Sequence, residues 1–320
     1  MDQLLRILAT QLADSTTFLT FDAPSPNPSV LNFPPLMIPP LRETDQVDFP
    51  ESGHSKQYLL HVAFEGWARR KPDAIALDFV HSLPSATAAA EHSLLTYAAL
   101  NQAATILAVH IRALLLAKNA ADYGRIIPVY MPSCPELYIT YLAVLKAGFA
   151  FSPIPQDAPV QRVRDVLEDI DCPIILGNTP EPVSGPWCDA SAGSTIKQVW
   201  VDVAEASRWK SLRDGQSESS DHGEPLEQLD IEHDQTAYLL FTSGSTGKPK
   251  GVQISHLAAA CSIEAHATEV PIPGEEIDDF RWFQFCAPTF DPSLAEIFVT
   301  LGCGATLCSA DRSLTLTDLE

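Results

Sequence analysis

Apolar and polar positions alternate along this chain in two distinct patterns from residue 57 onward. Short apolar runs bounded by turn residues predict buried strands, whereas apolar residues that recur every three to four positions predict helices. Strands are expected at 74–80, 126–131, 149–154, 173–177, 197–203, 236–241, 281–286 and 305–308, and helices at 95–119, 135–148, 159–171, about 254–267 and from Pro292. This alternation predicts an α/β protein with largely parallel sheets flanked by helices on both faces.

Four segments do not fit these patterns. Residues 1–17 carry leucines at helical spacing and predict a short amphipathic helix, and the proline-rich residues 22–50 predict an extended leader. Residues 83–93 and the polar, acidic stretch at about 205–234 predict exposed loops. We therefore expect an N-terminal helix and proline-rich leader over residues 1–54 and a partial globular domain over residues 55–320.

The N-terminus lacks the features of a secretory signal, because Asp2 stands where basic residues belong and Arg6 interrupts the apolar stretch. No continuous apolar run approaches the ~20 residues that are needed to cross a bilayer. We expect a cytoplasmic protein that has no membrane partner.

The charge of the chain narrows the choice of ligand. It contains 41 Asp and Glu residues against 20 Lys and Arg residues, for a net charge of −21. A surface this acidic disfavours binding to nucleic acid and to anionic membranes. A polyanionic ligand must therefore meet a local concentration of positive charge, which draws attention to Lys248 and Lys250.

Cysteine and histidine spacing gives no sign of a metal site. The seven cysteines include no Cys-x-x-Cys pair, and the nine histidines include no HExxH or comparable ligand spacing. This pattern predicts reduced and mostly buried thiols, and it predicts no metal-ligating residue.

The segment LLFTSGSTGKPKGVQISH, residues 239–256, concentrates hydroxyls, glycines and lysines after a predicted buried strand. Backbone N–H groups and hydroxyls in such a turn suit phosphate oxygens, and lysine adds a point charge. A Walker A loop is disfavoured, because Gly244 lies only three residues before Gly247 and Pro249 follows Lys248 where Ser or Thr is required. A plain flexible loop remains the alternative to a phosphate site.

Part of this segment, YLLFTSGSTGKPKGV, resembles the signature loop of the adenylate-forming superfamily, which includes acyl-CoA synthetases and the adenylation domains of nonribosomal peptide synthetases. Three further segments resemble that family in the expected order: LLTYAALNQAATILA (94–108), LKAGFAFSPI (145–154) and FQFCAPTFDPSLAEIF (283–298). Ala99, Phe151 and Ser152 depart from the family pattern. The last segment is typical of the peptide-synthetase branch, and the proline-rich start is similar to that of fungal synthetases. The resemblance implies the large N-terminal subdomain of an adenylate-forming enzyme, incomplete at its C-terminal side.

The resemblance also implies that ATP, with Mg²⁺, activates an amino acid as aminoacyl-AMP. It assigns the ATP phosphates to Thr242, Ser243, Gly244, Ser245, Thr246, Gly247, Lys248, Lys250 and Gly251. Thr242 and Lys250 occupy the positions expected to act in catalysis, with Lys250 favoured over Lys248 as the phosphate partner. The alternative for either lysine is a solvated side chain on a mobile loop.

Asp291 bears on the substrate class. In the amino-acid-activating branch, the Asp of the FD motif pairs with the α-ammonium group through a charge-assisted hydrogen bond, and we expect its carboxylate to be partly buried. Asp291 and Pro292 also form a good helix start, with Asp at the N-cap, and the two roles can coexist. The resemblance places Phe290 on the path between substrate carboxylate and nucleotide, with a core aromatic as the alternative. It places Pro292 and Ala295 in the side-chain pocket.

Several family features are missing. The sequence lacks the later motifs that approach the metal and the ribose, the lysine of the mobile C-terminal domain, and a GGxS phosphopantetheine attachment site. We therefore expect either a fragment of a synthetase that loads the phosphopantetheine thiol of a downstream carrier domain, beside condensation domains, or a truncated chain. An acyl- or aryl-CoA ligase and a non-catalytic binding or scaffold fragment remain alternatives. Glu296 and Ile297 are interpreted as packing or surface positions without a chemical role.

Overall fold

The structure of the protein, a computed structural model, describes residues 58–83, 89–117, 125–178, 199–203, 229–242, 248–269 and 280–317. All of them belong to the unit His54–Glu320. The predicted N-terminal helix and leader, most of the acidic stretch and the loop residues 243–247 lie outside the described residues.

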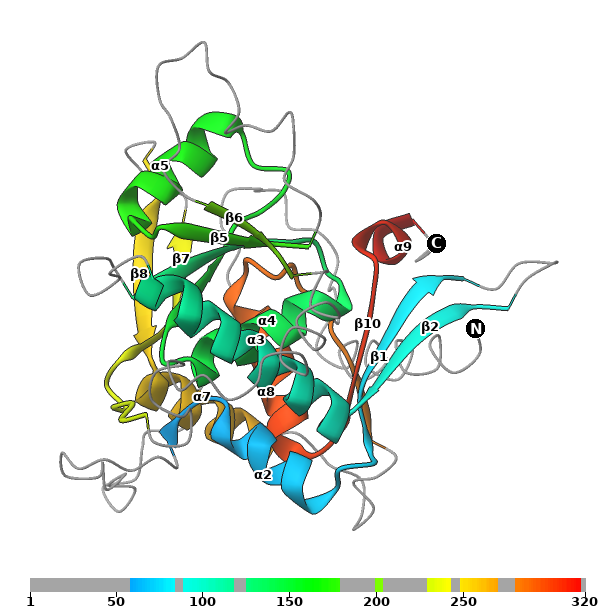
Figure 1. Ribbon diagram of the computed structural model, residues 1–320. Coiled ribbons are helices and arrows are strands. Elements are labelled where there is room, and N and C mark those ends of the chain that lie inside the picture. Colours follow the sequence, from blue (N-terminus) through cyan, green and yellow to red (C-terminus); the bar gives the residue numbers. More distant parts are fainter. Residues whose placement is uncertain are drawn as a thin grey trace, which may run out of the picture. The chain divides into compact units, whose positions relative to one another are not determined.

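Two sheets organise the described residues (Figure 1). The larger sheet has the order β6-β5-β3-β4-β7-β8, formed by Val199–Asp202, Ile174–Gly177, Ile126–Tyr130, Ala150–Pro153, Thr236–Thr242 and Lys250–Ser255. The smaller sheet has the order β2-β1-β10-β9, formed by Glu91–Thr96, Ile75–Ser82, Thr306–Ala310 and Arg281–Phe283. Only the β7–β8 and β1–β2 pairs among these are antiparallel, which confirms the prediction of largely parallel sheets.

The described helices are α2 (Val62–Arg70), α3 (Tyr97–Ala117), α4 (Pro135–Lys146), α5 (Val160–Ile170), α7 (His256–Glu269), α8 (Asp291–Cys303) and α9 (Arg312–Thr317). Figure 1 shows α3, α4 and α8 between the two sheets, and α8 packs on both α2 and α7. One continuous hydrophobic core joins residues of these helices with residues of both sheets. Within it, the rings of Tyr141 on α4 and Phe151 on β4 stack with their centroids 4.1 Å apart. The core therefore fixes α8 relative to the larger sheet.

Helix α4 begins and ends as its sequence predicts. Pro135 stands at the start, where its missing N–H costs no hydrogen bond, and Gly148 follows the last turn with φ of +81°. This positive φ favours glycine, because a Cβ crowds the backbone in the left-handed region.

Helix α3 is long and apolar enough, by length and composition alone, to cross a membrane. Its Leu100, Ala104, Leu107 and Ile111 are nevertheless fully buried in the protein core. This buried side packs on α4 and contacts α2, β1 and β2, as expected for a helix of a folded core.

The structure corrects several predicted elements. Residues 91–93 belong to strand β2, not to an exposed loop. Residues 250–255 form strand β8, so the helix predicted from about residue 254 begins at His256. Helices α2 and α9 were not predicted. Both β2 and β8 lie at the edge of their sheets and have half-buried or exposed side chains, so neither carries the apolar pattern of a buried strand.

The end of the acidic stretch is also different from the prediction. Leu229 and Ile231 are each 7% exposed and pack with Leu59 in a small cluster of their own. Leu229 and Ile231 are therefore part of the packed protein, and the exposed-loop prediction is wrong for these two residues.

The cysteines are less uniformly buried than expected. Among the six that the structure describes, Cys134, Cys172 and Cys308 are buried, whereas Cys261, Cys286 and Cys303 are half-buried. All six are free thiols.

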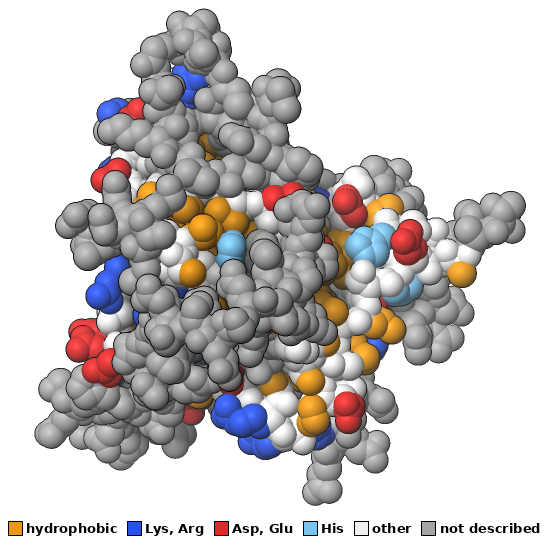
Figure 2. Space-filling model, viewed as in Figure 1, with side chains coloured by type: hydrophobic (Ala, Val, Ile, Leu, Met, Phe, Trp, Pro, Cys, Tyr) orange, Lys and Arg blue, Asp and Glu red, His pale blue; other side chains and the backbone are white. Residues whose placement is uncertain are grey.

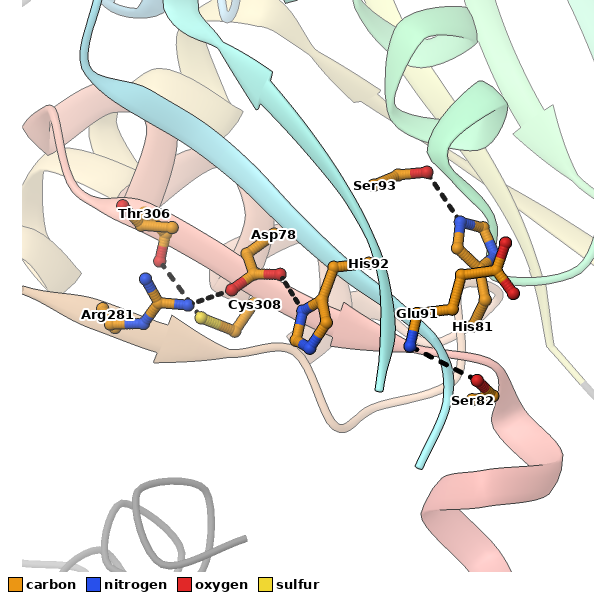
Figure 3. A network of polar contacts seen from close by, with 9 residues as sticks. All are labelled: Asp78, His81, Ser82, Glu91, His92, Ser93, Arg281, Thr306 and Cys308. Carbon is orange, nitrogen blue, oxygen red and sulfur yellow. Dashed lines mark hydrogen bonds and ion pairs between the residues drawn. The ribbon is translucent and has the colours of Figure 1, made fainter. Parts of the chain in front are cut away.

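A polar network crosses the smaller sheet (Figure 3). The carboxylate of Asp78 on β1 is largely buried, accepts a hydrogen bond from His92 Nδ1 on β2 at 2.8 Å and forms an ion pair with Arg281 on β9. The ring of His81 lies 2.6 Å from the Ser93 hydroxyl, which adds a second link between β1 and β2. Since β9 leads directly toward α8, the Asp78 pairs hold the start of the segment that carries the predicted substrate residues.

Candidate functional site

Strands β7 and β8 form the two sides of the predicted phosphate loop. They pair with Thr242 opposite Lys250, and the Thr242 hydroxyl donates a hydrogen bond to the Lys250 carbonyl oxygen at 3.3 Å. Lys248 and Lys250 are exposed, and neither forms an ion pair within the part of the chain that the structure describes. Two free ammonium groups at one turn suit an anionic ligand such as a triphosphate.

The loop residues between these strands are not among those that the structure describes. The predicted phosphate contacts of Ser243, Gly244, Ser245, Thr246 and Gly247 therefore stay predictions. Gly251 lies opposite Phe241 in the β7–β8 pair, and a Cβ at Gly251 would lie 2.8 Å from Leu239 Cδ1. Glycine at this position thus has a packing reason besides any contact with phosphate.

A buried polar network holds the segment between β9 and α8. The Tyr138 hydroxyl lies 2.9 Å from Gln284 Oε1 and 2.7 Å from Ser309 Oγ, and the Gln284 amide donates to the Cys286 carbonyl oxygen. The Cys286 N–H donates to Glu296 Oε2 at 3.1 Å, and burial raises the pKa of Glu296. Glu296 therefore ties this segment to α8, which is a structural role and agrees with its interpretation as a position without a chemical role.

The first turn of α8 presents Asp291 differently from the sequence prediction. Phe290 is the N-cap residue and no side chain caps the helix, so Asp291 is the first helical residue and not the cap. Its carboxylate is exposed, not partly buried as predicted, and has no hydrogen-bond or ion-pair partner among the described residues. Acidic side chains in a first helical turn are favoured by the helix dipole. A carboxylate without a partner is thus free to bind a cation.

A cavity of about 350 Å³ lies between α7 and α8 and contains three of the four predicted substrate residues. Asp291, Pro292 and Ala295 line it, whereas Phe290 does not. The Phe290 side chain is 58% exposed, so the alternative of a core aromatic is wrong. Burial raises the pKa of Tyr238 on β7, and the nearby Asp291 carboxylate raises it further. The structure therefore brings Asp291 close to the strand that leads into the phosphate loop.

The opposite wall of this cavity was not predicted from the sequence. It is formed by Ala259, Ser262, Ile263 and His266 on α7, together with Tyr238 and Trp282. The α7 residues recur at helical spacing right after the phosphate loop, and this periodicity was the available signal. The His266 ring donates from Nδ1 to the Ser262 carbonyl oxygen at 2.6 Å, so its Nε2 is left as an acceptor when the ring is neutral.

A smaller cavity of about 60 Å³ brings the two predicted sites together. Phe241, directly before Thr242, and Thr289, two residues before Asp291, both line it. The end of β7 and the start of α8 thus border one space, as a site that joins a nucleotide to an acid requires.

No group of three or more His, Cys, Asp or Glu side chains able to hold a metal ion occurs among the described residues. Among the described residues of the site, the ammonium groups of Lys248 and Lys250 and the carboxylate of Asp291 are charges without an ion-pair partner. This set fits a ligand that carries both an anionic and a cationic group.

The model of the AMP-binding enzyme family matches residues 64–320. The chain belongs to this family. It is 59% identical, over 326 aligned positions and its whole length, to the nonribosomal peptide synthetase sidC of Aspergillus fumigatus, of which it spans 7%. It is 41% identical over 283 positions to the siderophore peptide synthetase fer3 of Mycosarcoma maydis, covering 85% of this chain and 5% of that protein.

Solved structures agree with the fold. The N-terminal subdomain of NpsA from Klebsiella oxytoca, in complex with 3-hydroxybenzoyl-AMSN, matches 79% of this chain and 54% of that chain with a TM-score of 0.54 and 24% identity. A fused adenylation–PCP di-domain from the same organism matches 79% of this chain and 42% of that chain with a TM-score of 0.55 and 24% identity. The architecture is that of the N-terminal subdomain of adenylation enzymes, and the chain is related to nonribosomal peptide synthetases.

Proposed function

We propose that this chain binds an amino acid and the triphosphate of ATP, and that the complete domain joins them as aminoacyl-AMP. The observation that carries the proposal is the unpartnered carboxylate of Asp291 beside a cavity of about 350 Å³. The α-ammonium group of an amino acid suits this carboxylate as a charge-assisted hydrogen-bond donor. Its side chain would occupy the space beside Pro292 and Ala295.

The phosphate side of the reaction belongs to the β7–β8 turn. Lys250, with Lys248 as a second cation, supplies positive charge in a chain whose net charge is −21. The carboxylate oxygen of the acid attacks the α-phosphorus, and the bond to the leaving pyrophosphate breaks. Lysine and the donors of the turn stabilise the charge that develops on the phosphate oxygens. Thr242 would join them by turning its hydroxyl from the Lys250 carbonyl oxygen to the phosphate. Mg²⁺ would arrive bound to the ATP phosphates, where it neutralises part of their charge.

The acyl group would then pass to the phosphopantetheine thiol of a carrier domain. The relatives are named as peptide synthetases, and one solved neighbour is an adenylation–PCP di-domain, which supports this choice of partner. We propose that condensation domains of the same synthetase are further partners. We also propose that the protein works in the cytoplasm, where free thiols such as those of its described cysteines persist.

The test is ATP–pyrophosphate exchange with the protein produced from its complete natural reading frame. One reaction receives pooled amino acids and another receives pooled fatty and aryl acids. Exchange driven by amino acids supports the proposal. Exchange with the other acids alone indicates a CoA ligase, and the absence of exchange from a folded protein indicates a non-catalytic role.

The variant Asp291→Asn tests the ammonium partner directly. A hydrogen bond to a charged group contributes about 1.5–3 kcal/mol, so the exchange efficiency with the preferred amino acid should fall roughly 10- to 150-fold. The loss should appear mainly in the KM for the amino acid. Asp73→Asn removes the same charge from an exposed turn and should leave exchange unchanged. Equal activity of Asp291→Asn and Asp73→Asn would reject the assigned role.

A further inference from the structure

A second large cavity, of about 420 Å³, lies against α2, α3 and the C-terminal end of α4. It shares no lining residue with the cavity between α7 and α8. Its lining residues are Leu59, His61, Val62, Glu65, Arg69, Asn101, Thr105, Lys146, Leu229 and Ile231. The volume lies within the range of about 300–1,000 Å³ that is typical of small-molecule sites.

A nearly buried ammonium group forms the polar side of this cavity. Lys146 is 8% exposed, forms an ion pair with Glu65 and donates a hydrogen bond to Asn101 Oδ1 at 3.1 Å. An ammonium group has three N–H donors, so one donor has no partner among the described residues and can serve the cavity that Lys146 lines. Burying such a pair costs more than burying apolar residues of the same volume, and packing alone therefore gives no reason for it.

Two further donors face the same space. The amide oxygen of Asn101 accepts from Lys146, so the two N–H donors of its Nδ2 remain without a partner among the described residues. Arg69 is exposed in the last turn of α2, and no described residue pairs with its guanidinium group. Figure 2 shows Lys and Arg side chains gathered over α2, whose last turn carries Arg69 and Arg70.

The charges of the cavity favour an anion. Lys146 and Arg69 carry two positive charges and Glu65 carries one negative charge, which leaves a net positive site on a chain of net charge −21. His61 adds no charge near neutral pH, because burial and then Lys146 lower its pKa to about 3. An anion would be attracted electrostatically to this site, whereas the net negative charge of the chain repels it.

The opposite side of the cavity is apolar. We call Leu59, Val62, Leu229 and Ile231 the apolar wall; the two leucines and the isoleucine are buried together, and Val62 packs against them. Such a wall can bury an aliphatic chain, whereas a small inorganic anion has no apolar surface to bury against it.

We propose that this cavity binds a small organic anion in which a carboxylate is joined to a short aliphatic chain. Arg69, the Asn101 amide and the free N–H of Lys146 bind the carboxylate. The aliphatic chain packs on the apolar wall. The site is separate from the substrate cavity and does not depend on the proposed adenylation reaction.

Isothermal titration calorimetry of the 320-residue chain with hexanoate tests this site. Hexanoate should bind saturably, whereas inorganic phosphate and hexan-1-ol, which each lack one half of the recognised chemistry, should bind more weakly. The exposed Arg69→Gln variant should weaken hexanoate binding at least about tenfold, because it removes a hydrogen bond between charged groups. Val62→Asp places a negative charge in the apolar wall, at a helix start that tolerates acids, and should abolish binding.

Two controls separate this site from others. Arg125→Gln removes the same charge from an exposed position outside the cavity and should not change hexanoate binding. Ala295→Trp fills the cavity between α7 and α8 and should not change it either. The proposal is overturned if hexanoate does not bind saturably, if Arg69→Gln binds it as tightly as the unaltered chain, or if Ala295→Trp abolishes binding. Equal binding of phosphate or hexan-1-ol would also overturn it.

Discussion

Gly304, which ends helix α8, offers a quantitative test of how the helix that carries Asp291 is held in place. Its φ is +83°, and a Cβ at this position would lie 2.6–2.7 Å from three ring atoms of Trp67. The ring has little freedom to move, because its Nε1–H donates to the Gly302 carbonyl oxygen at 2.7 Å and the Arg70 guanidinium lies 4.2 Å from its centre. Alanine at position 304 therefore meets both backbone strain and a steric clash.

The expected loss follows from these two contributions. A residue with a Cβ in the left-handed region costs about 1–2 kcal/mol, and over-packing a filled site costs typically about 1–3 kcal/mol. Gly304→Ala should therefore lower the free energy of unfolding by about 2–5 kcal/mol. This is a large share of the roughly 5–15 kcal/mol that stabilises a typical protein.

Gly148→Ala is the matched control. Gly148 has a φ of +81°, but its Cβ would find the nearest atom, Ile231 Cγ1, at an ordinary 3.7 Å. Only the strain of about 1–2 kcal/mol should appear in this variant. The difference between the two variants then measures the clash with Trp67.

Urea denaturation of the 320-residue chain, followed by circular dichroism, measures both free energies by linear extrapolation. In a Trp67→Ala background, the excess cost of Gly304→Ala over Gly148→Ala should disappear, because the ring is gone. The reasoning is refuted if Gly304→Ala is no less stable than Gly148→Ala in the unaltered chain.

Three further predictions use the same chain. Tyr138→Phe should cost about 1–3 kcal/mol of unfolding free energy in urea, because two buried polar partners lose a hydroxyl. Tyr141→Phe should be neutral or stabilising, since its buried hydroxyl has no hydrogen-bond partner among the described residues; equal losses would contradict this. Burial lowers the pKa of His61 and of His256 to about 3. Between pH 6.5 and 3 the unfolded chain therefore binds more protons than the folded chain, so the free energy of unfolding should decrease as the pH is lowered, by up to about 1.4 kcal/mol per pH unit for each histidine. Urea titrations at several pH values should show that the free energy of unfolding decreases less steeply at low pH in His256→Asn than in the unaltered chain. An unchanged slope would contradict the role given to His256. Ala295→Trp should reduce amino-acid-driven pyrophosphate exchange for bulky side chains more than for glycine, and a uniform loss would place Ala295 outside the pocket.

Local sequence was sufficient for much of the fold. The apolar runs of β3, β4 and β5 are buried on both faces of a parallel sheet. A continuous apolar run predicts such a strand whichever strands become its neighbours in the sheet. Pro135 and Gly148 marked the ends of α4, because their backbone preferences are intrinsic to the residues. Strands β2 and β8 were missed for the converse reason, since their side chains are half-buried or exposed and leave no apolar run in the sequence.

Some features of the functional site were likewise predictable from the local sequence, and others were not. The sequence by itself predicted a phosphate role for the β7–β8 turn, because its hydroxyls, glycines and lysines are adjacent in the chain. It also indicated Asp291, Pro292 and Ala295, which share one helical turn. Only the tertiary structure shows that Phe290, not Asp291, is the N-cap residue of α8, and that the Asp291 carboxylate has no partner among the described residues.

The remaining features depend on contacts between residues far apart in the chain. The wall formed by α7, the hydrogen bond from Cys286 to Glu296 and the pairing of Lys146 with Glu65 and Asn101 each join separate elements. Periodicity reports which face of a helix is apolar, but it carries no information about which other element will cover that face. That choice is made when the core packs, and it determines where the two large cavities and their charges lie.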